Sequence, residues 1–183
     1  MREIELKSVV DDIAKRRRIV EDAGGELQFA GKLIDARYGD ADGRLMLADH
    51  VLRLRVYETG EGRKGHLDWK GPTEYENGYK VREELSTPVG DPGSLETMLE
   101  NLGYSVLMKI ERRIWQYVLH GATVRFEEYP QMDPLVEVEG PQQAIEQAIG
   151  VIGLPREGYT TDRLTDFVLR FEARTGRAAM LSS

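Results

Sequence analysis

The chain has 183 residues, of which 40% are hydrophobic and 31% charged, and its formal net charge is −7. It contains no Cys and only three His, which excludes disulfides, thiolate metal sites and Cys nucleophiles and disfavours a His-rich zinc site. The negative charge argues against a nucleic-acid partner, and no apolar segment approaches the roughly 18 residues that a membrane span needs. We therefore expect a single-domain cytoplasmic protein, and we leave open whether it forms a homodimer.

Most of the sequence is typical of β-strands joined by hairpin-length loops. Strands are expected over about residues 2–8, 26–38, 50–58, 66–72, 78–89 and 134–140, with a hairpin over 104–129 that turns at His120-Gly121. About eight strands and four helices favour an α+β fold, an antiparallel sheet or barrel with helices outside.

The helices are predicted from apolar spacing and from end signals. They are expected within 9–25, 91–103, 141–153 and 160–176. Ser94 is the expected N-cap of the second helix, and Gly103 follows its end. The predicted domain covers 1–176, and 177–183 is expected to be a loose C-terminal tail.

Several predicted strands carry charges of both signs on one face and aliphatic residues on the other. Because side chains alternate along a strand, Glu3, Glu5 and Lys7 share a face, while Ile4 and Leu6 lie on the opposite one. The same pattern recurs in Arg53 and Arg55, in Asp68 and Lys70, in Lys80, Arg82 and Glu84, in Arg125 and Glu127, and in Glu137 and Glu139.

Two architectures fit these charged faces. The sheet could pack one face on helices and expose the other to water, or it could close into a barrel whose charged faces surround a polar lumen. A lumen lined with Arg and Lys requires an anion, and clustered carboxylates suit a hard cation such as Mg²⁺ or Mn²⁺. A polyphosphate with divalent metal would meet both requirements.

The first strand, Glu3-x-Glu5-x-Lys7, resembles the ExExK signature of the CYTH superfamily, the triphosphate tunnel metalloenzymes. Further resemblances follow in family order over nearly the whole chain. They are Asp35, Tyr38 and Asp40 in "DARYGD", Arg53 and Arg55 in "LRLR", Lys70 in "LDWKGP", Arg82 and Glu84 in "VREEL", Glu127, Glu137 and Glu139 in "VRFEEYPQMDPLVEVE", and Arg156 and Tyr159 in "REGY".

The sequence departs from the family pattern at three places. Glu127 stands where Asp is usual, and Asp133 stands where Gly is common. The basic strand usually reads Lys-x-Arg, whereas "MKIERRIW" offers Lys109, Arg112 and Arg113 at imperfect spacing.

The resemblance implies a closed eight-stranded antiparallel β-barrel, the tunnel, with helices packed outside. It implies that Lys7 and Glu5 are catalytic and that Mg²⁺ or Mn²⁺ is bound. The implied metal ligands are Glu3, Glu5, Glu127, Glu137 and Glu139. The implied triphosphate-binding residues are Lys7, Arg53, Arg55, Lys70, Arg82 and one or two of Lys109, Arg112 and Arg113.

The resemblance implies a divalent-metal-dependent enzyme acting on a small-molecule triphosphate. The leading hypothesis is a phosphohydrolase for inorganic, nucleoside or thiamine triphosphate. The alternative is a class IV adenylyl cyclase that converts ATP to cyclic AMP and pyrophosphate. These cyclases carry a His-Phe pair shortly before ExExK, which the two residues ahead of Glu3 do not provide. A weaker alternative is a module that binds phosphate or polyphosphate without turnover.

Overall fold

The computed structural model describes residues 2–182, and their side chains from residue 4 onward. This part of the chain contains nine strands and five α-helices. The strands are β1 (Arg2–Val9), β2 (Glu26–Asp40), β3 (Val51–Thr59), β4 (Gly62–Lys70), β5 (Glu74–Glu76), β6 (Tyr79–Val89), β7 (Tyr104–Leu119), β8 (Ala122–Glu128) and β9 (Leu135–Glu139). The helices are α1 (Ile13–Asp22), α2 (Arg44–Leu47), α3 (Pro92–Asn101), α4 (Gln142–Ile152) and α5 (Leu164–Thr175).

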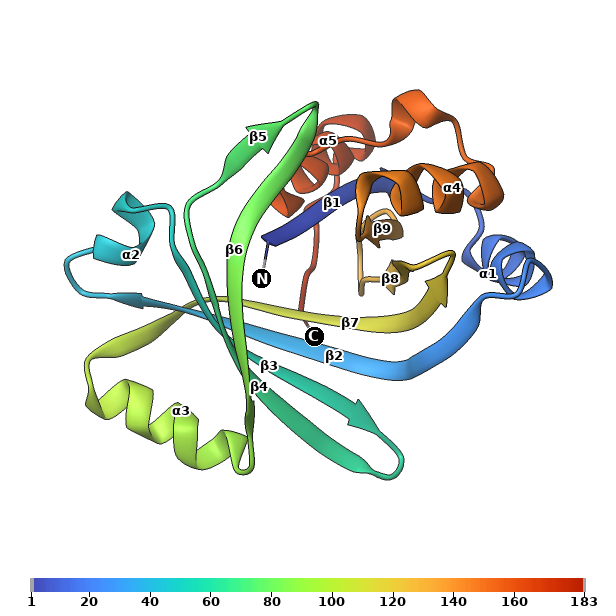
Figure 1. Ribbon diagram of the computed structural model, residues 1–183. Helices are drawn as coiled ribbons and strands as arrows, with labels where there is room; N and C mark the ends of the chain where they lie inside the picture. The colour runs from blue at the N-terminus through green and yellow to red at the C-terminus, as the bar shows by residue number, and fades with distance from the viewer. Residues whose placement is uncertain (1, 183) are drawn as a thin grey trace.

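Eight of the strands close into an antiparallel barrel (Figure 1). The order around the barrel is β1-β9-β8-β7-β2-β3-β4-β6, and β6 pairs with β1 to complete the ring. The short strand β5 adds to the edge of β6. The predicted α+β barrel is therefore confirmed, and the alternative of an open, solvated sheet is wrong.

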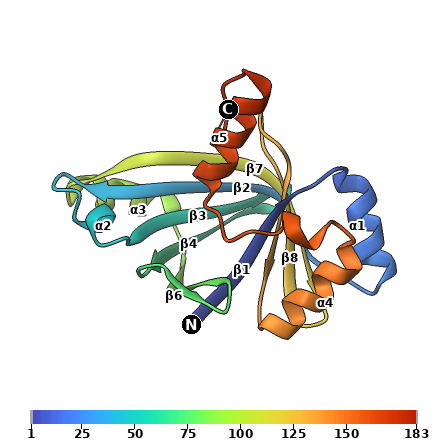
Figure 2. The ribbon, with the colours of Figure 1, turned by 90° about the horizontal axis from the view of Figure 1, so that it is seen from above.

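The outer wall of the barrel is apolar because the residues between the charged positions point outward. Helices α1 and α4 lie together on one flank (Figure 2), over a buried cluster that includes Leu6, Tyr117 and Phe126. Helix α3 covers a second cluster with Leu54 and Val56, which alternate with Arg53 and Arg55 along β3. These helices shield the outer face and leave the inner face to the charges.

Helix α5 packs on a third cluster at the rim of the barrel. Its buried Phe167 and Phe171 contact the group that contains Ile110, Tyr129 and Leu135. This packing brings the N-terminal end of α5 to the cavity inside the barrel, where Leu164 contributes to the lining.

The end of the chain is docked, although the sequence favoured a loose tail. The backbone N–H of Glu111 donates to the carbonyl of Leu181 at 2.6 Å, and Met180 forms an isolated bridge with Gln131. Ala179 and Leu181 also pack against the α5 cluster. The apolar side chains of Ala179 and Leu181 explain this docking, because packing against the cluster removes apolar surface from water.

Two short elements, α2 and β5, were not predicted, and one predicted cap was wrong. The N-cap of α3 is Asp91, whose Oδ1 accepts hydrogen bonds from the N–H groups of Gly93 and Ser94. Pro92 occupies the first turn, where its missing N–H costs nothing. Ser94 therefore lies inside the helix. None of the helices in residues 2–182 combines the length and the apolar composition that crossing a membrane requires.

The cap assignment predicts unequal effects for two substitutions in α3. Asp91→Ala removes the acceptor for two backbone N–H groups and should lower the free energy of unfolding by about 1 kcal/mol. Ser94→Ala leaves that acceptor in place and should cost clearly less. Urea unfolding of both variants beside the parent measures the difference, and a larger loss for Ser94→Ala would contradict the assignment.

Candidate active site

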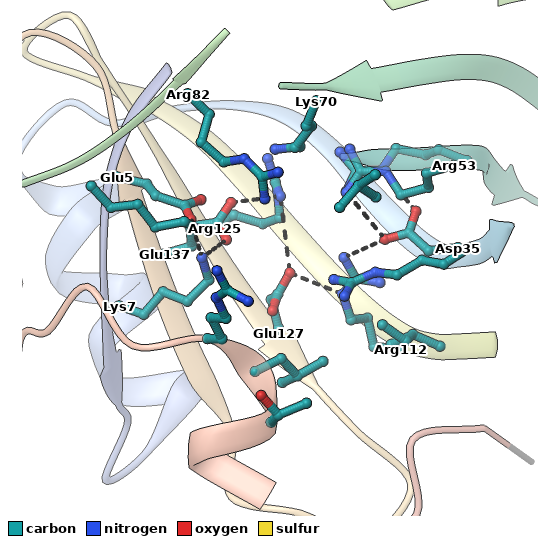
Figure 3. Close-up of a pocket in the computed structure, with 18 of the residues that line it drawn as sticks. Glu5, Lys7, Asp35, Arg53, Lys70, Arg82, Arg112, Arg125, Glu127 and Glu137 are labelled. Atoms are coloured by element: carbon teal, nitrogen blue, oxygen red, sulfur yellow. Dashed lines mark hydrogen bonds and ion pairs between the residues drawn. The ribbon is translucent and has the colours of Figure 1, made fainter. Parts of the chain in front are cut away.

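The barrel encloses a strongly charged cavity of about 220 Å³ (Figure 3). Its lining includes ten basic and five acidic side chains. The basic ones are Lys7, Arg37, Arg53, Arg55, Lys70, Lys80, Arg82, Arg112, Arg125 and Arg163, and the acidic ones are Glu5, Asp35, Asp49, Glu127 and Glu137. Among the lining residues whose side chains are described, basic groups therefore outnumber acidic ones, although the whole chain is acidic.

Lys7 joins two acids at the β1 side of the cavity. Its Nζ lies 2.8 Å from an oxygen of Glu5 and 2.8 Å from an oxygen of Glu137. Glu5 and Lys7 share a face because they are two residues apart on β1, and Glu137 is the cross-strand partner of Lys7 on β9. Lys80, opposite Glu5 on β6, binds the same Glu5 oxygen.

The charges in this group shift one another's pKa values. Burial alone would raise the pKa of Glu5, but Lys7 and Lys80 outweigh burial and hold it at about 2. Burial likewise opposes ionisation of Glu137, yet Lys7 and Arg125 hold its pKa well below the usual range. Burial would lower the pKa of Lys7, and the two carboxylates raise it instead. Glu5 and Glu137 are therefore carboxylates at neutral pH, and Lys7 is a permanent cation.

Asp35 on β2 is the centre of a second group of ion pairs. Its carboxylate accepts a hydrogen bond from Arg55 Nε at 2.9 Å and forms an ion pair with Arg112 Nη2 at 3.0 Å. Arg53 lies 3.7 Å away and pairs more closely with Asp68, at 2.7 Å. Burial would raise the pKa of Asp35, but the charges of Arg55, Arg53 and Arg112 keep it well below the usual value.

Two further acids connect the groups around the wall. Glu137 also accepts from Arg125 Nη1 at 2.8 Å. Glu127 accepts from Arg112 Nε at 2.9 Å and from the hydroxyl of Tyr129 at 2.5 Å. The ion pairs thus run around the wall of the cavity from β1 through β9 and β8 to β7 and β2.

Nine of the residues predicted from the sequence line this cavity. They are Glu5, Lys7, Arg53, Arg55, Lys70, Arg82, Arg112, Glu127 and Glu137. Lys70 lies 3.1 Å from Glu84. Arg82 donates through Nε to the carbonyl of Gly71 at 2.7 Å, so part of its guanidinium braces the loop after β4.

The other four predicted residues lie elsewhere or outside the described side chains. Arg112 points inward, so alternation along β7 turns Lys109 and Arg113 outward. Lys109 pairs with Glu111 at 2.8 Å with 53% of its side chain exposed, and Arg113 stacks on Trp115. Glu139 lies 3.8 Å from Arg125 but is not part of the lining, and Glu3 precedes the first described side chain.

Six further charged residues line the cavity, although no catalytic, phosphate-binding or metal-binding role was predicted for them from the sequence. They are Asp35, Arg37, Asp49, Lys80, Arg125 and Arg163. The inward direction of four of them could have been predicted from the alternation of side chains, because each lies two residues from another inward charge on the same strand. Asp49 and Arg163 lie in connections, where no periodicity indicates direction, and they meet at 3.1 Å.

The carboxylates are arranged as ion-pair partners. Among the residues whose side chains are described, no group of three or more His, Asp or Glu is gathered closely enough to hold a metal ion. Glu5 and Glu137 nevertheless place one oxygen each at 2.8 Å from a single positive charge, the ammonium of Lys7. Two ionised carboxylates around one cation are oxygen donors of the kind that Mg²⁺ and Mn²⁺ prefer.

Comparison with known proteins gives one family and a shared fold. The family model for the CYTH domain matches residues 1–148. No curated protein matches the sequence significantly.

Solved structures with the same fold include three whose chains this protein covers almost completely. A provisionally assigned adenylate cyclase from Vibrio parahaemolyticus is 17% identical, with a TM-score of 0.77 and 91% of this chain and 97% of that chain covered. PH1819 from Pyrococcus horikoshii is 19% identical, with a TM-score of 0.75 and coverage of 92% and 98%. HpAC1 from Hippeastrum, a provisionally assigned adenylyl cyclase with a dominant triphosphatase activity, is 16% identical, with a TM-score of 0.66 and coverage of 98% and 99%.

The lowered pKa values predict that acid weakens the fold. A carboxyl group whose pKa is depressed in the folded state stabilises that state above its unfolded pKa of about 4, and this stability is lost as the pH falls through the folded value. The contribution of Glu5 is on the order of 3 kcal/mol, lost between about pH 5 and pH 2. The free energy of unfolding should stay level above about pH 5 and fall steadily below it.

Urea unfolding from pH 7 to pH 2 measures this loss. Glu5→Gln should flatten the acid limb, whereas Glu83→Gln, at an exposed position on β6, should leave it unchanged. Equal acid limbs in the parent and in Glu5→Gln would contradict the assigned pKa shift.

Proposed function

This chain belongs to the CYTH domain family, and on that premise we propose that it is a divalent-metal-dependent triphosphatase. The triphosphate group of its substrate would bind inside the barrel, among the basic side chains of the cavity. Water would then attack the terminal phosphorus and release phosphate.

The excess of basic over acidic side chains in the cavity carries the proposal. Ten basic and five acidic side chains are among the described lining residues, and two of the basic ones, Arg53 and Lys70, pair with Asp68 and Glu84 outside the lining. Buried charge without compensation is costly, so the cavity favours an anion with several negative charges over a singly charged one. Arg and Lys provide the donors that phosphate oxygens accept.

The size of the cavity supports binding of the phosphates more than of a large organic group. A volume of about 220 Å³ is below the roughly 300–1,000 Å³ of pockets that enclose drug-sized ligands. Tyr129 is the one aromatic residue among the described lining residues, and its hydroxyl donates to Glu127. This lining favours hydrolysis of a triphosphate over cyclisation, which requires a nucleoside held beside the α-phosphorus.

The protonation states suggest the roles of the residues around Lys7. With its raised pKa, Lys7 keeps its proton and serves as a donor that orients phosphate or the attacking water. With a pKa of about 2, Glu5 is a weak base, so its expected role is to hold a cation. Glu137 fits the same role, since both acids already surround one positive charge.

Metal would complete this arrangement. Charge neutralisation on the phosphate oxygens and a more acidic attacking water are what Mg²⁺ or Mn²⁺ supplies when bound. Glu5 and Glu137, with Glu127 and Glu139 from the neighbouring wall, are the proposed ligands. The dominant triphosphatase activity described for HpAC1, which shares this fold, supports hydrolysis.

An assay with separate product detection tests the proposed reaction. Inorganic triphosphate, ATP and thiamine triphosphate are each incubated with Mg²⁺ or Mn²⁺, while phosphate, pyrophosphate and cyclic AMP are measured. At least one substrate should release phosphate, and excess chelator should abolish the release because oxygen ligands favour hard divalent ions. Cyclic AMP with pyrophosphate as the main products would establish the cyclase instead, and tight binding without any product would establish a binding module.

Substitution at Glu5 separates catalysis from folding. Glu5→Gln keeps the size of the side chain but removes its charge, so turnover should fall roughly 10²-fold, and more Mg²⁺ should be needed for half-maximal rate. Lys7→Gln should also lose turnover but keep the parental Mg²⁺ requirement, since an ammonium group cannot bind the cation. Glu83→Gln, on the outer face of β6, is the matched control and should retain the parental rate. Parental turnover in Glu5→Gln would rule out its role at the metal.

A further inference from the structure

Arg37 is a cation of the cavity that has no acid of its own. It lies on β2, two residues after Asp35, and lines the cavity. Among the described side chains, no Asp or Glu lies within the 4.0 Å ion-pair distance of Arg37, and its Nε has no hydrogen-bond partner. The neighbouring arginines do have acids: Arg53 binds Asp68, and Arg55 binds Asp35.

The surroundings of Arg37 are more positive than negative. Arg53 is its direct cross-strand neighbour on β3. Burial and the charges of Arg53 and Arg112 lower the pKa of Arg37 to about 10, and Asp35 only partly offsets them. Arg37 remains charged at neutral pH, and its Nε is a buried donor without a hydrogen-bond partner among the described residues.

A second unpaired donor lies on the adjacent strand β7. Arg112 is 7% exposed. Its Nε forms an ion pair with Glu127, and its Nη2 forms one with Asp35. Its Nη1 is buried and has no hydrogen-bond partner. Buried N–H groups almost always find an acceptor, so two unpaired donors on one cavity wall indicate a missing anionic ligand.

The backbone is irregular at the same place. The pairing of β2 with β7 changes register between Arg37 and Tyr38. Such a bulge adds a residue to one strand and redirects the neighbouring side chain, and bulges are common beside active sites. Here the extra residue is Leu107 on β7, between Met108 opposite Arg37 and Val106 opposite Tyr38, so β7 is irregular beside Arg37 while alternation along β2 keeps Asp35 and Arg37 on the inner face.

The position of β2 in the ring indicates which part of the ligand Arg37 can reach. The order β1-β9-β8-β7-β2-β3-β4-β6 places β2 four strands from β1 in either direction. Lys7 on β1 and Arg37 on β2 therefore lie on opposite walls of the cavity. An anion that contacts both must extend across the barrel.

We propose that Arg37, together with Nη1 of Arg112, forms an anion subsite for the end of the triphosphate chain that is remote from Lys7. This assignment rests on the proposed function and makes Arg37 a residue that determines specificity for phosphate-chain length. Because the two residues lie on opposite walls, we expect a triphosphate to reach both and a pyrophosphate held at Lys7 to end before the β2 wall. Arg37 then contributes to binding of the longer chain and little to binding of the shorter one.

The same argument fixes the sign of the effect on stability. An unpaired buried cation destabilises the free protein, so replacing Arg37 should preserve or increase the free energy of unfolding. Residues that are needed for ligand binding often lower the stability of the fold in this way. Arg53 is the opposite case, because removing it takes the closest cation away from the buried carboxylate of Asp68 and leaves only Arg55, at 4.0 Å. Substitution of Arg37 should therefore weaken triphosphate binding without lowering the free energy of unfolding. Substitution of Arg53 should lower both.

The test measures melting temperature and ligand affinity on the full chain. Arg37→Met, Arg53→Met and a control, Arg63→Met, are compared with the parent; Arg63 lies on β4 with 58% of its side chain exposed. Binding of inorganic triphosphate and of pyrophosphate is measured by calorimetry in chelator, so that no hydrolysis occurs. Arg37→Met should weaken triphosphate binding about tenfold or more, the scale of one charged hydrogen bond, and weaken pyrophosphate binding much less.

The melting temperature of free Arg37→Met should equal or exceed that of the parent, while Arg53→Met should melt lower and Arg63→Met should match the parent in every measurement. Arg37→Lys keeps the charge without the fork of donors and should recover part of the triphosphate affinity. Equal losses for both ligands, parental triphosphate affinity, or an unfolded or clearly less stable Arg37→Met would overturn the inference. A parent that binds neither ligand in chelator and releases no phosphate in the Mg²⁺ assay would overturn the proposed function itself, whereas tight parental binding that survives Arg37→Met would overturn only the role of Arg37.

Discussion

Opposite charges that face each other across neighbouring strands are the interaction on which this barrel depends. The register places Lys7 opposite Glu137, Glu5 opposite Lys80, and Asp35 opposite Arg55. It also pairs Arg53 with Asp68, Lys70 with Glu84, and Arg125 with Glu137. A shift of one residue would turn these charges to the apolar exterior, and a shift of two would change every partner. Charge pairing inside and helix packing outside therefore select the same register.

The network combines two demands that a buried site makes on its residues. In the free protein, each carboxylate that lines the wall needs a cation, since a lone buried charge is strongly destabilising. A site for a polyanion also needs spare positive charge. The cavity meets both demands by pairing its acids and keeping basic side chains in excess. Lys7, between two carboxylates, belongs to the paired part, whereas Arg37 and one N–H of Arg112 belong to the spare part.

The outer layers keep this interior in position. Helices α1 and α4 bury the outer faces of β1, β7, β8 and β9, and α3 buries those of β2, β3 and β4. Helix α5 and the docked end of the chain cover the rim near Ile110 and Tyr129. Because the apolar faces are fixed by helices, inward side chains are held on rigid strands, which suits a site that must position phosphate groups accurately.

The sequence by itself determined the strands, their two faces and most of the charged residues inside, because alternation with period two is a local property that needs no knowledge of the fold. The local pattern and the family signature were enough to predict the closed barrel and nine of its lining residues. Only the tertiary structure decided which of Lys109, Arg112 and Arg113 points inward, since one change of phase along β7 reverses all three.

It also decided that Asp91 caps α3, that the last residues dock, and that Arg37 has no acidic partner among the described side chains. These features depend on which segments meet in space. The partner of a buried charge comes from a neighbouring strand, so it cannot be predicted from the sequence of one strand alone.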